Sequence, residues 1–268
     1  MKIERAERSR QKRNERIIGG SDVTDSTSWP FIVNIGGVCG GSLISSQHVL
    51  TAGHCCSRDN FKYLNFYFGI RKLSEKNSAG QTRGVKGYKI HSDFSRDTLD
   101  NDLCVVLLDR PVELGFSVQP ISLPRGNDQI FEKDFDGNVF IAGWGITDTS
   151  TGEVSDSLKN ALVRFVPDGR CSSQSYYGNA FNATAHFCAG DDNTDACTFD
   201  SGGPAVVLKH RNYRLLENAK PGKEAVVAPH SAILASITSW GRGCARENKP
   251  GVYVRIESYL RNFAKFFR

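Results

Sequence analysis

Three separated segments carry residue types that could act together in nucleophilic catalysis. His54 follows the strand-like run HVLTAG, Asp102 precedes the apolar run LCVVLL, and Ser201 lies in a loop next to two glycines. A serine hydroxyl is a weak nucleophile at neutral pH, so it needs a base that takes its proton, and that base needs an orienting carboxylate. Histidine, aspartate and serine in this chain order fit those roles.

The elements that must position these residues are predicted to be strands. Runs rich in β-branched and aromatic residues recur between clusters of Gly, Asn, Asp and Ser, which is typical of a β-sandwich or β-barrels. The runs are FIVNI, HVLTAG, LNFYFGI, LCVVLL, NVFIAGWG, NALVRFV, GGPAVVL, AILASITSW and GVYVRI. Only the C-terminal end has helical periodicity. Its apolar face consists of Ile256, Tyr259, Leu260, Phe263 and Phe267.

Length, apolar runs and charge argue against a membrane-spanning protein and against a nucleic-acid-binding one. The 268 residues are enough for one large or two small domains, and no apolar run is long enough to cross a bilayer, so we expect no membrane span. The net charge is +5, but residues 1–16 alone carry +4. The remaining chain is nearly neutral, so no nucleic-acid partner is expected. The basic segment lacks the apolar region of a signal peptide.

The eight cysteines indicate disulfides rather than a metal site, because they are even in number and lack paired C-x-x-C spacing. They are Cys39, Cys55, Cys56, Cys104, Cys171, Cys188, Cys197 and Cys244. Disulfides imply an oxidising compartment, so we expect a secreted or extracellular protein. Since no signal peptide is visible, we expect the natural N-terminus to lie further upstream.

From residue 17 onward the chain resembles the trypsin-like serine proteases. The matching motifs, in family order, are RIIGG, WPFIV, CGGSLIS, LTAGHC, IHSDF, DNDLCVVLL, IAGWG, DAC, DSGGP, SWGRGC and KPGVYVRI. The resemblance implies an all-β chymotrypsin-like fold of two packed six-stranded antiparallel barrels with a C-terminal helix. We place a propeptide at 1–16, a protease domain at 17–268, barrels at about 29–120 and 138–254, and the helix at about 256–267.

The resemblance also implies a zymogen and a triad of His54, Asp102 and Ser201. Cleavage after Arg16, by an activating protease, would free the amine of Ile17 to pair with Asp200. A buried ammonium and carboxylate must be paired to be tolerated, so this pair would order the substrate pocket.

Specificity for Arg or Lys is implied by Asp195, which matches the carboxylate at the base of trypsin's primary pocket. Ala196 replaces a hydroxyl there and favours Arg. Gly241 and Gly251 match open pocket walls, whereas Ser239 and Trp240 match the segment that aligns the substrate as an added strand. The expected partners are polypeptides with Arg or Lys at the cleavage site.

Family matching pairs Cys39 with Cys55, Cys171 with Cys188 and Cys197 with Cys244. Cys56 and Cys104 have no usual counterpart, but they follow the His54 and Asp102 segments, so we predict a fourth bridge between them. Further expectations concern glycosylation, metals, cofactors and assembly. Asn182, in NAT, is a glycosylation acceptor in a secreted protein. The segment 69–89 has Glu75 as its only carboxylate, so no metal is expected. We also expect no cofactor and a monomer.

Phe199 departs from the family, whose oxyanion hole uses the backbone N–H groups of a glycine here and of Ser201. Either the backbone keeps the family geometry and the ring lies along the cleft, or the Cβ strains that geometry and the N–H turns away. The second case would leave a protease-like binding protein. The insertion at 209–230 is either a tolerated loop or a binding site for inhibitors or an exosite partner.

Overall fold

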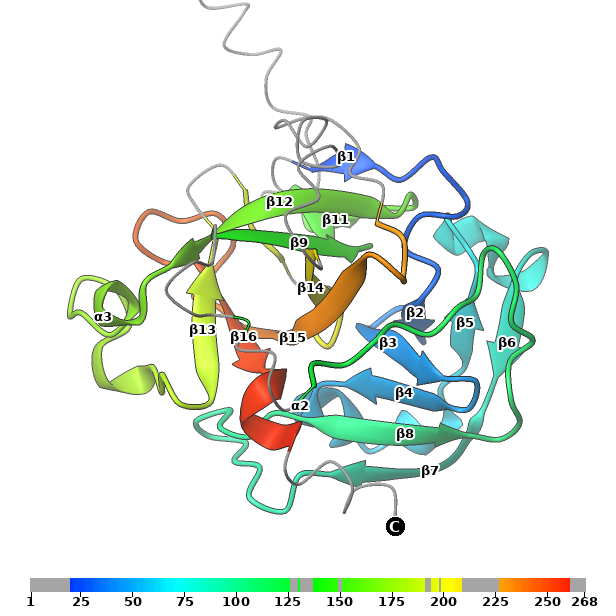
Figure 1. Ribbon diagram of the computed structural model, residues 1–268, viewed down its shortest axis with the longest axis horizontal. Helices are drawn as coiled ribbons and strands as arrows, with labels where there is room; N and C mark the ends of the chain where they lie inside the picture. The colour runs from blue at the N-terminus through cyan, green and yellow to red at the C-terminus, as the bar shows by residue number, and fades with distance from the viewer. Residues whose placement is uncertain are drawn as a thin grey trace, which may run out of the picture.

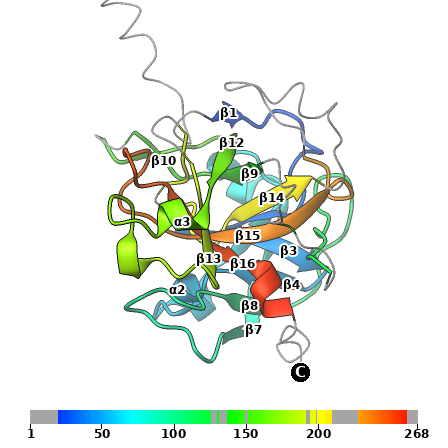
Figure 2. The same cartoon turned by 60° about the vertical axis from the view of Figure 1, so that its left-hand side comes forward.

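A computed structural model describes residues 20–125, 130, 137–148, 151–190, 194–197, 199–208 and 227–260. Within this part of the chain nearly all regular structure is β, arranged in two large antiparallel sheets (Figures 1 and 2). The sheets meet where β3 (Cys39–Ser45) contacts β14 (Pro204–Leu208). Gly40 there donates a backbone hydrogen bond to the carbonyl oxygen of Ser201, at 2.8 Å. The predicted all-β class is confirmed.

The N-terminal sheet is curled, and its two edge strands, β6 and β7, follow one another in the sequence. Its order is β6-β5-β2-β3-β4-β8-β7. Because only Gly84 separates β6 from β7, they act as one bent strand, which gives the six-stranded count that the sequence predicts. The strands are β2 (Ile32–Ile35), β3 (Cys39–Ser45), β4 (His48–Thr51), β5 (Phe66–Phe68), β6 (Gln81–Arg83), β7 (Val85–Ile90) and β8 (Cys104–Leu108).

The C-terminal sheet closes by hydrogen bonding. Its order is β1-β12-β13-β16-β15-β14-β9, and β12 also pairs with β9, so six strands form a closed barrel to which β1 is added. Its strands are β1 (Ser21–Asp22), β9 (Asn138–Gly143), β12 (Lys159–Val166), β13 (His186–Ala189), β14 (Pro204–Leu208), β15 (Ala232–Trp240) and β16 (Gly251–Arg255). A separate hairpin joins β10 (Ile146–Asp148) and β11 (Glu153–Val154).

Apolar side chains from both sheets fill the core. Phe31, Phe66 and Phe68 are at most 1% exposed in the N-terminal sheet, and Phe187 and Tyr253 are fully buried in the C-terminal barrel. Burying each such aromatic ring stabilises the fold by about 1.5–3 kcal/mol. The apolar runs of the sequence thus become strands because their side chains can be buried there.

Helices are short in the described residues. They are α2 (Gly53–Cys56), α3 (Asp168–Cys171) and the 3₁₀ turns Phe61–Tyr63, Leu73–Asn77, Gly178–Ala180 and Ile256–Tyr259. The last turn begins where the C-terminal helix is expected; residues 261–268 lie outside the described part. No helix in the described ranges is long and apolar enough to cross a membrane.

Candidate active site

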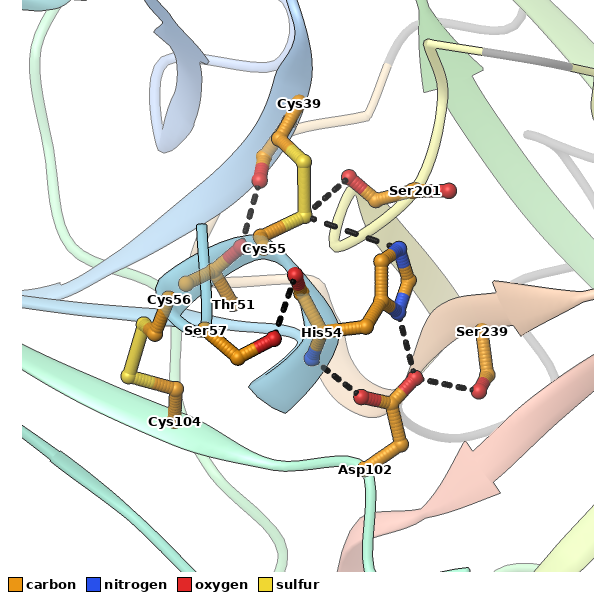
Figure 3. The surroundings of a disulfide bond; sticks show 11 residues. Cys39, Thr51, His54, Cys55, Cys56, Ser57, Asp102, Cys104, Ser201 and Ser239 are labelled. Carbon is orange, nitrogen blue, oxygen red and sulfur yellow. Dashed lines mark hydrogen bonds and ion pairs between the residues drawn. A yellow bond between two sulfur atoms is a disulfide. The ribbon is translucent and has the colours of Figure 1, made fainter. Parts of the chain in front are cut away.

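Two hydrogen bonds join His54 to Asp102 (Figure 3). The imidazole Nδ1 lies 2.8 Å from Asp102 Oδ2, and the His54 backbone N–H donates to Oδ1 at 2.7 Å. The Ser239 hydroxyl donates to Oδ2 at 2.5 Å. The Asp102 side chain is fully buried, whereas that of His54 is 21% exposed. The carboxylate therefore fixes the ring while the other ring nitrogen, Nε2, remains available.

Two disulfides hold the short helix that carries His54. Cys55 is joined to Cys39 at the start of β3, and Cys56 is joined to Cys104 at the start of β8. Because Cys104 lies two residues after Asp102, the second bridge links the histidine segment covalently to the aspartate segment (Figure 3). The other two bridges, Cys171–Cys188 and Cys197–Cys244, complete the pairing expected from the sequence.

Ser201 lies in a tight loop that precedes β14. Gly202 has φ +78°, and a Cβ there would collide with Thr51, which explains the need for glycine. The Ser201 carbonyl oxygen lies 3.6 Å from Cys55 Sγ, which in turn lies 3.8 Å from His54 Nε2. Figure 3 shows the hydroxyl directed away from the imidazole, and no hydrogen bond joins the two within the described chain. A rotation about the side-chain bond is needed to bring Oγ toward Nε2.

Asp200 is a buried carboxylate behind the serine loop. It is 3% exposed and accepts backbone hydrogen bonds from Gly145, at 2.9 Å, and from Cys197, at 3.0 Å. Burial raises the pKa of Asp200 to about 6 against these two bonds. A nearby cation would stabilise the ionised form of this buried carboxylate. Arg16 and Ile17, the predicted activation residues, lie outside the described part.

Asp195 is a buried carboxylate held by backbone N–H groups of a distant segment. Its carboxylate accepts N–H bonds from Ala245, at 3.0 Å, and from Gly251, at 3.1 Å, and the residue is 1% exposed. A Cβ at Gly251 would lie 2.7 Å from Asp195 Oδ1, so only glycine leaves space beside the carboxylate. Burial raises the pKa of Asp195 to about 7, and the nearby Asp200 adds to this. Ala196 is buried beside it, and Gly241 is exposed.

A histidine that the sequence analysis did not place in the site lies behind the Ser239–Trp240 segment. His186 is 1% exposed, and its Nε2 lies 3.1 Å from the Leu99 carbonyl oxygen. Its ring packs edge-on against Trp240, with centroids 6.3 Å apart. Leu99 has φ +55°, an unfavourable conformation for a leucine. His186 thus connects Leu99 to Trp240, and no local pattern in the sequence signals this contact.

Phe199 adopts the left-handed conformation, with φ +77°. A residue with a Cβ is strained there by about 1–2 kcal/mol. The structure therefore keeps a backbone conformation suited to glycine although the residue is phenylalanine. Its ring is half-buried.

This strain predicts an inverted stability order at position 199. Both Phe199→Gly and Phe199→Ala remove the ring, but only alanine retains the Cβ. We expect the glycine variant to have the larger free energy of unfolding, by about 1 kcal/mol, measured by urea denaturation. At exposed Lys86 in β7, which lacks positive φ, Lys86→Gly should instead be less stable than Lys86→Ala. If the alanine variant is more stable than the glycine variant at position 199 as well as at position 86, strain at Phe199 is refuted.

Two peripheral residues have defined contacts. Exposed Asn182 donates from Nδ2 to Asp100 Oδ1 at 3.1 Å, and its Oδ1 accepts the Thr184 hydroxyl at 2.7 Å. Glu75 accepts the backbone N–H groups of Arg71 and Lys72, at 2.8 and 3.0 Å. The carboxylate of that loop therefore closes a local turn. The insertion at 209–230 lies outside the described part up to residue 226.

Comparison with known proteins identifies the family. The family model described as Trypsin matches residues 17–262. Trypsin iota of Drosophila melanogaster is 32% identical over 249 residues, covering 90% of this chain and 84% of that protein. Coagulation factor XII of Cavia porcellus is 34% identical over 94% of this chain, and transmembrane protease serine 11G of Mus musculus is 32% identical over 91%.

The chain spans 41% of the coagulation factor and 54% of the transmembrane protease. It belongs to the family of trypsin-like serine proteases, and its two curled sheets have the chymotrypsin fold.

Proposed function

We propose that this protein is a serine endopeptidase that cleaves polypeptides after Arg or Lys. The observation that carries the proposal is the buried Asp102 bonded to both the backbone and the ring of His54, next to the Ser201 loop. Family membership supports the class of reaction. The buried carboxylate of Asp195 supports the choice of substrate, and we propose that it forms the base of a recess for the substrate's basic side chain.

The proposed reaction proceeds through an acyl-enzyme. His54 Nε2 takes the Ser201 proton as Oγ attacks the scissile carbonyl carbon, and Asp102 stabilises the imidazolium that forms. The carbonyl oxygen becomes an oxyanion that the backbone N–H groups of Phe199 and Ser201 bind. His54 then protonates the leaving amine. Water, activated by the same histidine, hydrolyses the ester and restores Ser201.

Substrate selection is assigned to the Asp195 recess. A substrate guanidinium would pair with the carboxylate, and Ala196 offers no hydroxyl to solvate a lysine ammonium, so Arg is preferred over Lys. The backbone of Ser239, Trp240 and Gly241 would align the substrate as an added strand. The half-buried ring of Phe199 would lie at the leaving-group side and exclude bulky inhibitors.

The protein is further proposed to be a secreted, glycosylated zymogen, with 1–16 as propeptide and 17–268 as the protease domain. Four disulfides support an oxidising compartment. Cleavage after Arg16 by an activating protease would supply the Ile17 ammonium that the buried carboxylate of Asp200 lacks among the described residues. Exposed Asn182 is the proposed glycan site.

The decisive experiment measures kcat/KM on matched Arg and Lys peptide amides, using protein whose N-terminus is shown to be Ile17. Ser201→Ala should lower the rate by about 10⁶-fold. A fluorophosphonate should label the parent and not this variant, because it reacts only with an activated serine. An Arg rate that survives Ser201→Ala would disprove the mechanism. Absence of both rate and label, with both restored in Phe199→Gly, would indicate a binding protein with a disabled oxyanion hole.

A further inference from the structure

An open pocket adjoins His54, and Asp195 is not among its lining residues. Its volume is about 380 Å³, and it is lined by His54, Ser57, Arg58, Asp59, Arg96 and Leu99. The two arginines come from different loops, one following α2 and the other preceding Asp102. The pocket therefore lies between two loops that also carry members of the catalytic pair.

The positive charges of this pocket are not neutralised by ion pairs. Arg58 and Arg96 are exposed, and neither takes part in any ion pair of the described residues. Arg96 donates from Nη2 to the Ser57 carbonyl oxygen, which fixes its guanidinium at the pocket wall, and its other N–H groups have no hydrogen-bond partner among the described residues. Asp59 is the single carboxylate of the lining.

The nearby Asp100 is already engaged elsewhere. Its Oδ2 accepts the Thr98 hydroxyl at 3.0 Å, and its Oδ1 accepts the Asn182 amide at 3.1 Å. Among the described residues it forms no ion pair with Arg96. The pocket has two cations and one anion, beside a body of the chain that is nearly neutral overall.

We propose that this pocket binds an acidic side chain of the substrate next to the scissile bond, with Arg96 and Arg58 as specificity-determining residues. The inference rests on the proposed protease function. A scissile carbonyl within reach of Ser201 and His54 places the neighbouring residue about 3.8 Å further along the chain, at a pocket that His54 itself lines. Arginine binds a carboxylate through paired N–H donors. The preferred substrate thus combines a basic residue, for Asp195, with an adjacent acidic one.

The test uses internally quenched peptides cleaved after Arg by the Ile17 protein. One pair differs only by Asp or Asn immediately before the Arg, and a second pair differs in the same way immediately after the scissile bond. In at least one pair we expect the Asp peptide to have a kcat/KM about threefold to tenfold higher, with the ratio falling as salt is added. Arg96→Gln and Arg58→Gln should each reduce this ratio toward one. Lys62→Gln, a basic residue outside the pocket, should preserve it.

Two results would separate the inference from the function on which it rests. Equal rates for Asp and Asn peptides in both pairs, with Ser201-dependent hydrolysis retained, would overturn the inference alone. If no peptide is hydrolysed, the proposed function fails, and the affinities of Ser201→Ala protein for the same peptides then decide the inference. Equal affinities, or a preference for Asp that survives loss of both arginines, would refute it.

Discussion

Asp102→Asn is expected to lower kcat by about 10⁴-fold, the magnitude known for this exchange in Ser–His–Asp triads. In the parent, Oδ1 accepts the His54 backbone N–H while Oδ2 accepts Nδ1–H and the Ser239 hydroxyl. Asparagine has one acceptor oxygen, which the backbone N–H requires because that group can only donate. The amide NH₂ then faces Nδ1 and forces the proton onto Nε2. A ring in this tautomer cannot accept the Ser201 proton.

The matched control is Ser239→Ala, which removes one donor from Asp102 but leaves its charge and the histidine tautomer intact. We expect a fall in kcat of no more than about a hundredfold, since one hydrogen bond to a charged group is lost. KM should change little in Asp102→Asn, because the Asp195 recess is untouched. Equal losses of kcat in the two variants would contradict the assigned role of the carboxylate.

Asp195→Asn is expected to lower kcat/KM for Arg peptide amides by about thirtyfold to several thousandfold. Removing one partner of a buried charge pair costs about 2–5 kcal/mol, because the other charge is left unpaired. The substrate guanidinium would lose its anion at the base of a recess where Asp195 is only 1% exposed. A norleucine peptide, of similar length but uncharged, should be hydrolysed no more slowly by the variant. An equal loss for both substrates would indicate a damaged fold instead of a lost charge.

The same carboxylate predicts a pH dependence of ligand binding. Burial raises the pKa of Asp195 to about 7, and only the ionised form pairs with a cation. The affinity of Ser201→Ala protein for benzamidinium should therefore be constant well above pH 7 and fall up to tenfold per pH unit below it. Catalysis is absent in this variant, so the titration of His54 as a base does not enter the measurement. In Ser201→Ala protein that also carries Asp195→Asn, the inflection should disappear.

Much of the fold was predictable because buried strands carry apolar side chains. All nine runs identified in the sequence overlap strands of the structure, including β4, which precedes His54, and β8, which follows Asp102. β7 was not identified, because VKGYKI alternates partly buried residues with exposed lysines and lacks a continuous apolar run. β13 was also missed, since HFCA contains no β-branched residue. Local composition predicts a strand only when burial reaches most of its residues.

The site was predictable where local motifs fix the residues, and less so where distant segments meet. His54 and Asp102 were predicted from their flanking residues, and the structure joins them. The contact of His186 with Leu99 spans 87 residues, and nothing near either residue indicates it. The raised pKa of Asp195 likewise results from burial. Residues distant in the sequence contribute to this burial, and Gly251, which contacts the carboxylate, lies 56 residues away.

The Cys56–Cys104 bridge makes the base and its carboxylate part of one cooperative unit. Its two cysteines each lie two residues after a member of the pair, so α2 cannot separate from β8 by local unfolding while the bridge is intact. Ser201 belongs to the other half of the molecule, where Cys197–Cys244 fixes its loop. Partial opening of the molecule would therefore separate an intact His–Asp pair from an intact serine loop. The complete site would then be lost when the two crosslinked halves separate, and it would be restored when they pack together again.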